Sequence, residues 1–243
     1  MQLEAPRNEM EIAFARRDAL IEKQEDLMPE LEDYLVDTKF GFPRVEHPFF
    51  KSASFSDGHY AFVNQLFREH QQAADEALEQ REWFTFVGLH EVPYWLQAFE
   101  EIADKLSDDD YWEVLGQIYT DAENLCDNQH RLGRLLNSKR PKRHRIMDET
   151  ERGEIEELPT ELTVYRGYSL KKRSRAWSWT LDEDKAEWFA RRCRIQRIKS
   201  GQPRIAQGRV RKDDIVAYFS RREESEIVVD PKLISGIRDV RVN

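Results

Sequence analysis

Residues 178–190 have the sequence SWTLDEDKAEWFA, which predicts a short strand running directly into a helix. Alternate side chains of a strand share a face, so we expect Ser178 and Thr180 on one side and Trp179 on the other, in the core. Asp182 is a suitable N-cap for the helix. Apolar residues then recur at helical spacing, at Ala186, Phe189 and Ala190.

Strand-like runs occur on both sides of this stretch. They are short and apolar, and turns and one substantial helix separate them, which is the pattern of an α+β fold. The predicted strands are Leu162–Arg166, Ala176–Thr180, Ile205–Val210, Ile215–Phe219, Ile227–Asp230 and Ile237–Val242. The sequence contains no Gly-x-Gly-x-x-Gly and no Gly-x4-Gly-Lys motif, so it does not predict a Rossmann fold or a P-loop.

Two polar motifs lie beside these runs. Tyr-Arg-Gly at 165–167 ends the first run, and Glu-Ser-Glu at 224–226 leads into the fifth. Strand alternation would place Glu224 and Glu226 on one face. Each motif alone is typical of a solvated surface. Their occurrence in one order, with the Ser-x-Thr pair between them, indicates a shared site.

In order and spacing, these three motifs resemble the R-S-E class of mono-ADP-ribosyltransferases, in the toxin-like bacterial or phage branch that ends in Glu-x-Glu. The resemblance covers about residues 158–243. It implies a split, two-sheet β-sandwich that binds NAD in the cleft between its sheets. NAD would be a substrate, and no metal would be needed.

The resemblance also implies roles for the matching residues. Glu226 would stabilise the nicotinamide ribose while its bond to nicotinamide breaks, and Glu224 would orient the acceptor and take its proton. Arg166 would bind the pyrophosphate, Gly167 would approach the nicotinamide amide, and Ser178 would position Glu226. The expected catalytic residues are Glu226, Glu224, Arg166 and Ser178. The expected NAD-binding residues are Arg166, Gly167, Ser178, Thr180 and Glu226.

The resemblance leaves the acceptor open. Glu-x-Glu favours a protein arginine side chain. The segment expected to recognise the acceptor contains Phe219, Arg221 and Arg222 together with Glu224. Two arginines would repel an arginine acceptor and attract a polyanion, so the bases of RNA or DNA are the alternative. A second alternative is a non-catalytic module that binds nucleic acid or protein.

Residues 1–130 predict an acidic, mainly helical region, residues 131–157 a basic connector with one short helix, and residues 158–243 the catalytic core. Capping and breaker residues predict helices over 8–25, 29–36, 59–82, 94–106 and 108–126, and a loop over 38–57.

Charge divides the chain. Residues 1–130 contain 10 Lys/Arg and 29 Asp/Glu, a net of −19, and residues 131–243 contain 28 Lys/Arg and 18 Asp/Glu, a net of +10. Seven basic residues fall within 131–145. They predict either a solvated loop or a segment that binds phosphates. The plainest alternative is that the acidic and basic halves dock on each other.

Other classes of function have little support. Cys126 and His130 have half of a zinc-ligand spacing, and no second pair completes it. No run of 18 apolar residues and no signal-peptide pattern occurs, so we expect a cytoplasmic protein without a membrane partner. The resemblance implies an intracellular toxin or effector, as in toxin–antitoxin or phage-defence systems, with a neutralising antitoxin or immunity partner.

Overall fold

A computed structural model describes residues 23, 25–37, 43–54, 60–122, 128–169, 176–196, 202–220 and 224–240. The chain forms two compact units, unit 1 over Met1–Ile102 and unit 2 over Ala103–Asn243. The sequence placed its boundaries at 130 and 157 instead, so the helix that begins at Asp108 belongs to the same unit as the predicted core.

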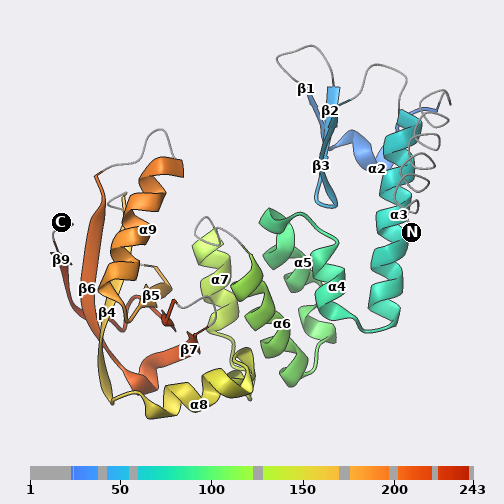
Figure 1. Ribbon diagram of the computed structural model, residues 1–243. Helices are drawn as coiled ribbons and strands as arrows, with labels where there is room; N and C mark the ends of the chain where they lie inside the picture. Colours follow the sequence, from blue (N-terminus) through green and yellow to red (C-terminus); the bar gives the residue numbers. More distant parts are fainter. Residues whose placement is uncertain are drawn as a thin grey trace, which may run out of the picture. The chain divides into compact units, whose positions relative to one another are not determined.

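Unit 1 combines helices with a small antiparallel sheet of order β1-β2-β3 (Figure 1). Its elements are α2 (Pro29–Glu32), β1 (Leu35–Asp37), β2 (Pro43–His47), β3 (Phe50–Ser54), α3 (Tyr60–Glu79), α4 (Trp83–Gly88), η1 (Val92–Tyr94) and α5 (Trp95–Ile102). The helices predicted over 59–82 and 94–106 are confirmed, with shorter bounds. The helix predicted over 8–25 lies outside the described residues, apart from 23 and 25 at its end.

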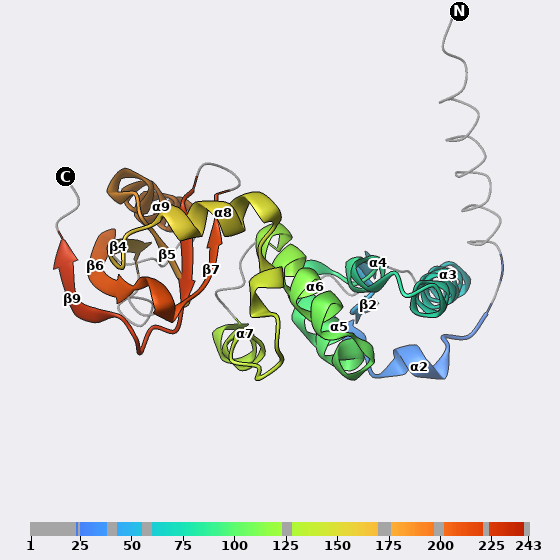
Figure 2. The same cartoon turned by 90° about the horizontal axis from the view of Figure 1, so that it is seen from below.

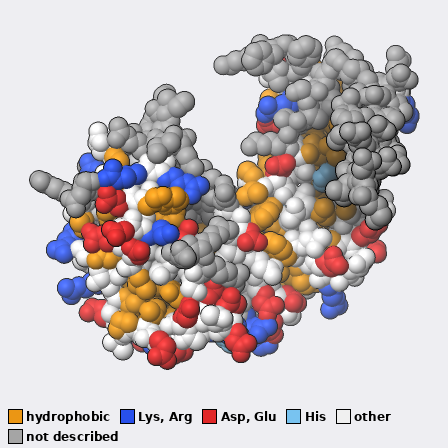
Figure 3. Space-filling model, in the orientation of Figure 1, with side chains coloured by type: hydrophobic (Ala, Val, Ile, Leu, Met, Phe, Trp, Pro, Cys, Tyr) orange, Lys and Arg blue, Asp and Glu red, His pale blue; other side chains and the backbone are white. Residues whose placement is uncertain are grey.

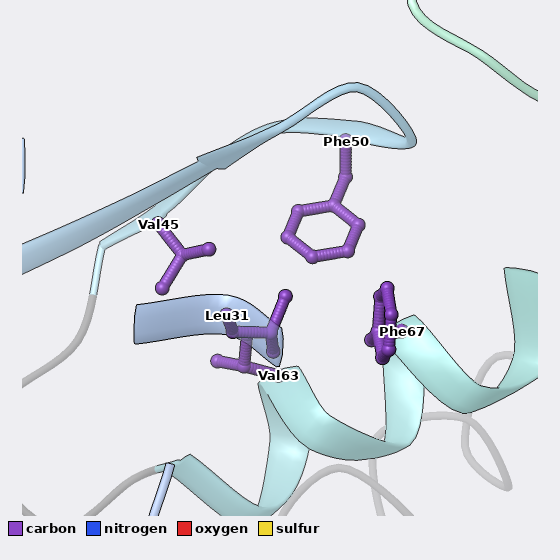
Figure 4. Close-up of a cluster of buried hydrophobic side chains, with 5 residues drawn as sticks. All are labelled: Leu31, Val45, Phe50, Val63 and Phe67. Atoms are coloured by element: carbon purple, nitrogen blue, oxygen red, sulfur yellow. The ribbon is translucent and has the colours of Figure 1, made fainter. Parts of the chain in front are cut away.

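The loop predicted over 38–57 is wrong, because β2 and β3 form a hairpin there. Pro43 is the first residue of β2, and Pro48 lies in the turn, so neither removes a ladder hydrogen bond from a strand interior. The hairpin contributes to the core of unit 1, which contains Leu31, Val45, Phe50, Val63 and Phe67 (Figure 4). The helix predicted over 29–36 ends at Glu32.

In unit 2, most of the described helices come before the sheet in the sequence, and the others lie between its strands (Figure 2). They are η2 (Ala103–Lys105), α6 (Asp108–Asp121), α7 (Gln129–Leu136), η4 (Arg143–Ile146), α8 (Glu149–Glu157), α9 (Glu183–Gln196) and η6 (Lys212–Asp214). The three aspartates at 108–110 form the first turn of α6, and its N-cap is Ser107, whose hydroxyl accepts from the Asp110 amide. Asp148 and Glu151 form a capping box on α8.

The sheet of unit 2 has six strands in the order β7-β8-β5-β4-β6-β9, and every neighbouring pair is antiparallel. The strands are β4 (Glu161–Tyr168), β5 (Ser178–Thr180), β6 (Arg204–Arg211), β7 (Ile215–Phe219), β8 (Glu226–Val229) and β9 (Ser235–Val240). All six predicted strands are therefore confirmed within a few residues. With its helices, the chain has the predicted α+β composition.

The sheet is narrow at its centre. β4 and β5 share a single residue pair, Tyr165 with Thr180, whereas β4 and β6 pair along eight residues. The guanidinium of Arg166 crosses this joint, because its Nη1 donates to the backbone oxygen of Ser178 at 2.5 Å. The joint separates β7-β8-β5 from β4-β6-β9.

Helix α9 packs on β4 and begins as predicted (Figure 1). Oδ1 of Asp182 accepts from the amides of Asp184 and Lys185 at 2.8 and 3.1 Å, so Asp182 is its N-cap. The helix lies close to Gly167, where a Cβ would come within 1.9 Å of the Ala186 backbone oxygen. Glycine at this position is therefore needed for packing.

The basic connector docks on α6. Arg140, Lys142 and Arg145 form ion pairs with Asp108, Asp109 and Glu113. Arg140 also donates to the backbone oxygens of Ala103 and Leu106. These ion pairs join the last helix of the acidic half to the start of the basic half, and docking of the halves as wholes stays a prediction. Both signs of charge also lie on the visible face of unit 2 (Figure 3).

No helix in the described part of the chain combines the length and the apolar character needed to cross a membrane.

Gly167→Ala should destabilise unit 2, because the new methyl group would displace the backbone of α9. Overpacking of this kind costs about 1–3 kcal/mol. Gly153→Ala is the matched control, because a Cβ there meets nothing within 4 Å and alanine favours the α8 helix. Urea unfolding midpoints of the two variants and the wild type provide the test. A neutral Gly167→Ala would contradict the packing assigned to α9.

Candidate active site

The three sequence motifs meet at the central joint of the sheet. They line one pocket with a volume of about 140 Å³. Its lining residues are Tyr165, Arg166, Gly167, Ser178, Trp179, Thr180, Phe189, Glu224 and Glu226. Six of these nine residues were proposed from the sequence as site residues. The helix after the Ser-x-Thr pair contributes Phe189, which the sequence placed only on the apolar face of the helix.

Glu226 lies at the start of β8 with its carboxylate half-buried in the pocket. Its Oε1 accepts a hydrogen bond from the Tyr119 hydroxyl at 2.7 Å. Burial raises the pKa of Glu226 above its ordinary value of 4.5, while hydrogen bonds from Ser178 and Tyr119 lower it. Ser178 therefore contacts Glu226 as expected. The charge of Glu224 raises this pKa further, and the charge of Arg166 lowers it.

Tyr119 is the site residue that sequence analysis missed. It lies in α6, on the apolar face that also carries Trp112, Leu115 and Ile118, and its spacing predicts a core residue. Its ring is indeed buried, at 8% exposure. The only sequence signal for its contact with Glu226 is the hydroxyl, because a buried tyrosine needs a hydrogen-bond partner. That partner is 107 residues away in the sequence, so the sequence could not identify it.

The two glutamates are not related by strand alternation as predicted. Strand β8 begins at Glu226, and Ser225 before it has a φ of +40°, in the left-handed region. This conformation breaks the period of two between Glu224 and Glu226. Both residues still line the pocket, but Glu224 reaches it from a bent segment. A non-glycine residue in this conformation costs energy, and such strain is common at functional sites.

Thr180 fixes this bent segment. Its hydroxyl donates to the backbone oxygen of Glu224 at 2.7 Å and accepts from the amide of Asp182 at 3.1 Å. The Leu181 amide donates to the backbone oxygen of Ser225 at 3.1 Å. The Thr180 side chain is 5% exposed. Thr180 lines the pocket, so its place among the NAD-binding residues stays a prediction, and its polar group also holds Glu224 in position.

Gly167 and Arg166, both expected to bind NAD, also stabilise the fold around the pocket. Gly167 lines the pocket, but the side that lacks a Cβ faces α9. Arg166 lines the pocket and bonds the Ser178 backbone across the joint, so part of its hydrogen-bonding capacity maintains the sheet.

Phe219 does not lie on an acceptor surface. It is 2% exposed and stacks on Tyr119 with ring centroids 5.1 Å apart and planes at 22°. It is also the cross-strand partner of Glu226. The prediction that Phe219 recognises the acceptor is therefore wrong for this conformation. Arg221 and Arg222 lie outside the described residues.

A second pocket of about 310 Å³ lies over β6 and β9. It is lined by Thr163, Gln207, Gly208, Arg209, Ser235, Gly236 and Arg238. Nε of Arg238 donates to Gln207 Oε1 at 2.8 Å, and Nε2 of Gln207 donates to the Tyr165 hydroxyl at 3.3 Å. Because Tyr165 lines the first pocket, these bonds connect the two pockets. Neither arginine is paired with a carboxylate among the described residues.

Within the described residues, no group of three or more His, Cys, Asp or Glu side chains has the arrangement of a metal site. His47, His70 and His90 gather around Phe49 in unit 1, and Nδ1 of each forms a hydrogen bond with the backbone. Cys126 lies outside the described residues.

Comparison with known proteins found no matching family, no similar curated protein and no similar solved structure.

Glu226→Gln should stabilise the protein at neutral pH. The pKa of Glu226 is raised on folding, so the wild type loses stability relative to the Gln variant as pH rises through and above about 4.5. Below that range the carboxyl group is protonated in both the folded and unfolded states, and the difference should disappear. Melting temperatures between pH 4 and pH 8 test this. Glu154→Gln, at an exposed position of α8, is the control. A Glu226→Gln protein without this pH-dependent gain would contradict the buried-charge assignment.

Proposed function

We propose that unit 2 is the catalytic core of a mono-ADP-ribosyltransferase that transfers ADP-ribose from NAD to a macromolecule. The observation that carries the proposal is the convergence of Arg166, Ser178, Glu224 and Glu226 on one pocket, although they come from separate segments of the chain. Neither the composition of the chain nor its α+β fold class requires these four residues to lie together. The strands of unit 2 form one six-stranded sheet, and the narrow joint between β4 and β5 is where the proposed split sandwich would divide it.

The reaction requires these residue types. The bond between ribose C1′ and the nicotinamide nitrogen breaks, its electron pair leaves with nicotinamide, and C1′ acquires oxocarbenium character. A fixed carboxylate beside the ribose stabilises charge that develops only in the transition state. Glu226 has that place in the proposal. The acceptor then forms a bond to C1′ and gives its proton to Glu224.

The size of the pocket suits one end of the dinucleotide. Its volume of about 140 Å³ is below the ~300–1,000 Å³ that pockets for drug-sized ligands have. We propose that the nicotinamide and its ribose occupy it. Arg166, which lines the pocket, remains the candidate for a charge-assisted contact with the pyrophosphate.

The acceptor in this proposal is a protein side chain, an arginine by the Glu-x-Glu motif. Glu224 supports this choice, because Thr180 holds its backbone beside Glu226 and its carboxylate lines the same pocket. The proposed setting is an intracellular toxin or effector with a neutralising partner, which rests on the resemblance alone.

Glu226→Gln should lower NAD cleavage by about 10²-fold or more, since one preorganised charge is lost. Glu224→Gln should abolish transfer to protein and retain some hydrolysis of NAD. The measurement uses labelled NAD with a cell lysate, and follows nicotinamide release and labelled macromolecules separately. Glu154→Gln, away from the pocket, is the control.

Two outcomes would contradict these roles. A Glu226→Gln protein with the wild-type rate would remove the catalytic carboxylate from the proposal. Equal loss of transfer and hydrolysis in Glu224→Gln would remove its separate acceptor role. A wild-type protein that consumes no NAD with any lysate would favour the non-catalytic module.

ADP-ribosylation of RNA or DNA bases is the second candidate, and the arginine-lined pocket favours it. Arg209 and Arg238 are exposed, and the Gln207 side chain links their pocket to the first one. If the phosphates of an RNA or DNA strand bound in this pocket, its bases would lie beside the first pocket, where NAD is proposed to react. The basic connector gives this candidate less support than its sequence suggests, because three of its cations are paired with α6.

If the acceptor is a nucleic acid, charge reversal at Arg209 and Arg238 should weaken binding of a single-stranded RNA or DNA oligonucleotide. The slope of log affinity against log salt should fall by about one for each phosphate group that the variant no longer binds. Arg211→Glu, on the same strand but outside the pocket, is the control. Label found only in the protein fraction, with no oligonucleotide binding by the wild type, would exclude this candidate.

A further inference from the structure

We propose that Tyr119 is a positioning residue for the Glu226 carboxylate, which makes helix α6 part of the catalytic unit. The proposal deepens the function proposed above and rests on it for the reaction. Its geometry is independent of that function, because a buried tyrosine from one helix bonds a carboxylate from a distant strand.

The Tyr119 hydroxyl can act on Glu226 only as a donor. Burial and the neighbouring charge of Glu226 raise the pKa of this hydroxyl well above its ordinary value of 10, so it stays protonated. It therefore stabilises the ionised carboxylate at Oε1, at a distance of 2.7 Å. Ser178 donates to the same carboxylate, so two donors from different elements, helix α6 and strand β5, hold it.

The tyrosine ring cannot turn away freely. It stacks on Phe219, which is the cross-strand partner of Glu226. Ring and carboxylate thus share one support, the β7–β8 pair. The sheet therefore fixes the position of the ring relative to the carboxylate. Groups held in place in this way need little reorganisation energy when charge develops in the transition state.

Helix α6 packs closely against η4. Gly116, three residues before Tyr119, approaches η4 so closely that a Cβ would lie 2.1 Å from the backbone oxygen of Ile146. Residues three apart lie on the same side of a helix. The close approach therefore fixes the helix on the side from which Tyr119 extends.

The chemical need for this donor is clear from the surroundings of Glu226. Burial and the charge of Glu224 favour the neutral acid, which cannot stabilise a developing cation. Hydrogen bonds from Tyr119 and Ser178, together with the charge of Arg166, favour the carboxylate. Loss of one donor should therefore shift Glu226 towards the neutral form at a given pH.

The test compares Tyr119→Phe with the wild type in the pH dependence of kcat/KM for NAD cleavage. Phenylalanine preserves the ring on Phe219 and removes only the hydroxyl. The acid limb should move to higher pH. The rate on the acid side should fall about tenfold to 100-fold, as expected for one hydrogen bond to a charged group. Towards alkaline pH the variant should approach the wild-type rate.

Tyr111→Phe is the matched control. Tyr111 lies on the same helix, is 4% exposed, and donates its hydroxyl bond to the backbone oxygen of Leu135 at 3.0 Å. Its loss should lower stability to a similar extent without moving the acid limb. An equal loss of rate at every pH in Tyr119→Phe, or the same limb shift in Tyr111→Phe, would overturn the positioning role.

A second measurement separates this proposal from the reaction. The carboxyl carbon of Glu226 can be titrated by NMR in protein labelled with ¹³C-glutamate and assigned through Glu226→Gln. Its pKa should be higher in Tyr119→Phe than in the wild type. If NAD is not consumed and this shift is present, the proposed reaction fails and the Tyr119 contact stands. If NAD is consumed and the shift is absent, the Tyr119 proposal fails alone.

Discussion

The interaction on which the rest of unit 2 depends is the set of contacts around the Glu226 carboxylate, where burial opposes ionisation and hydrogen bonds favour it. The carboxylate lies at the first residue of β8, beside the narrowest part of the sheet. Two hydroxyl donors and one guanidinium lower its pKa, and burial together with Glu224 raises it. Because the pKa of Glu226 is raised on folding, its ionised carboxylate does not stabilise the folded state. Its surroundings resemble those of functional carboxylates, whose environments are arranged to alter their pKa.

The local arrangement supports these contacts. Thr180 and Leu181 bond the backbone oxygens of Glu224 and Ser225, so the strained segment is held by the strand that also carries Ser178. Arg166 bonds the same strand from the other side of the joint. The three motifs therefore depend on one another for their positions. This mutual support explains why they meet at one place in the fold.

Sequence patterns predicted the strands of unit 2 well, because each is a run with the length of a strand, bounded by turn residues. Alternating burial was not the common signal, since β7 is buried at all of its positions. They also predicted the start of α9, because Asp182 has the chemistry of an N-cap. The hairpin of unit 1 was missed, since Pro43 and Pro48 suggest a loop unless their places at a strand start and in a turn are known. Tyr119 was assigned to the core, and periodicity cannot distinguish a core tyrosine from one whose hydroxyl serves a site. Ser225 was taken as part of a regular strand, because no sequence pattern specifies a left-handed serine.

The division of charge had several interpretations, and the structure favours the local one. The acidic first turn of α6 and the basic connector lie far apart in sequence and pair within unit 2. These pairs are partly exposed, so each contributes little to stability. They lie where α6 packs on η4, and the close contact that Gly116 allows there holds the helix that carries Tyr119. Charges that suggested a polyanion partner are therefore paired within unit 2, on the same helix that brings a tyrosine from the acidic half to a carboxylate of the basic half.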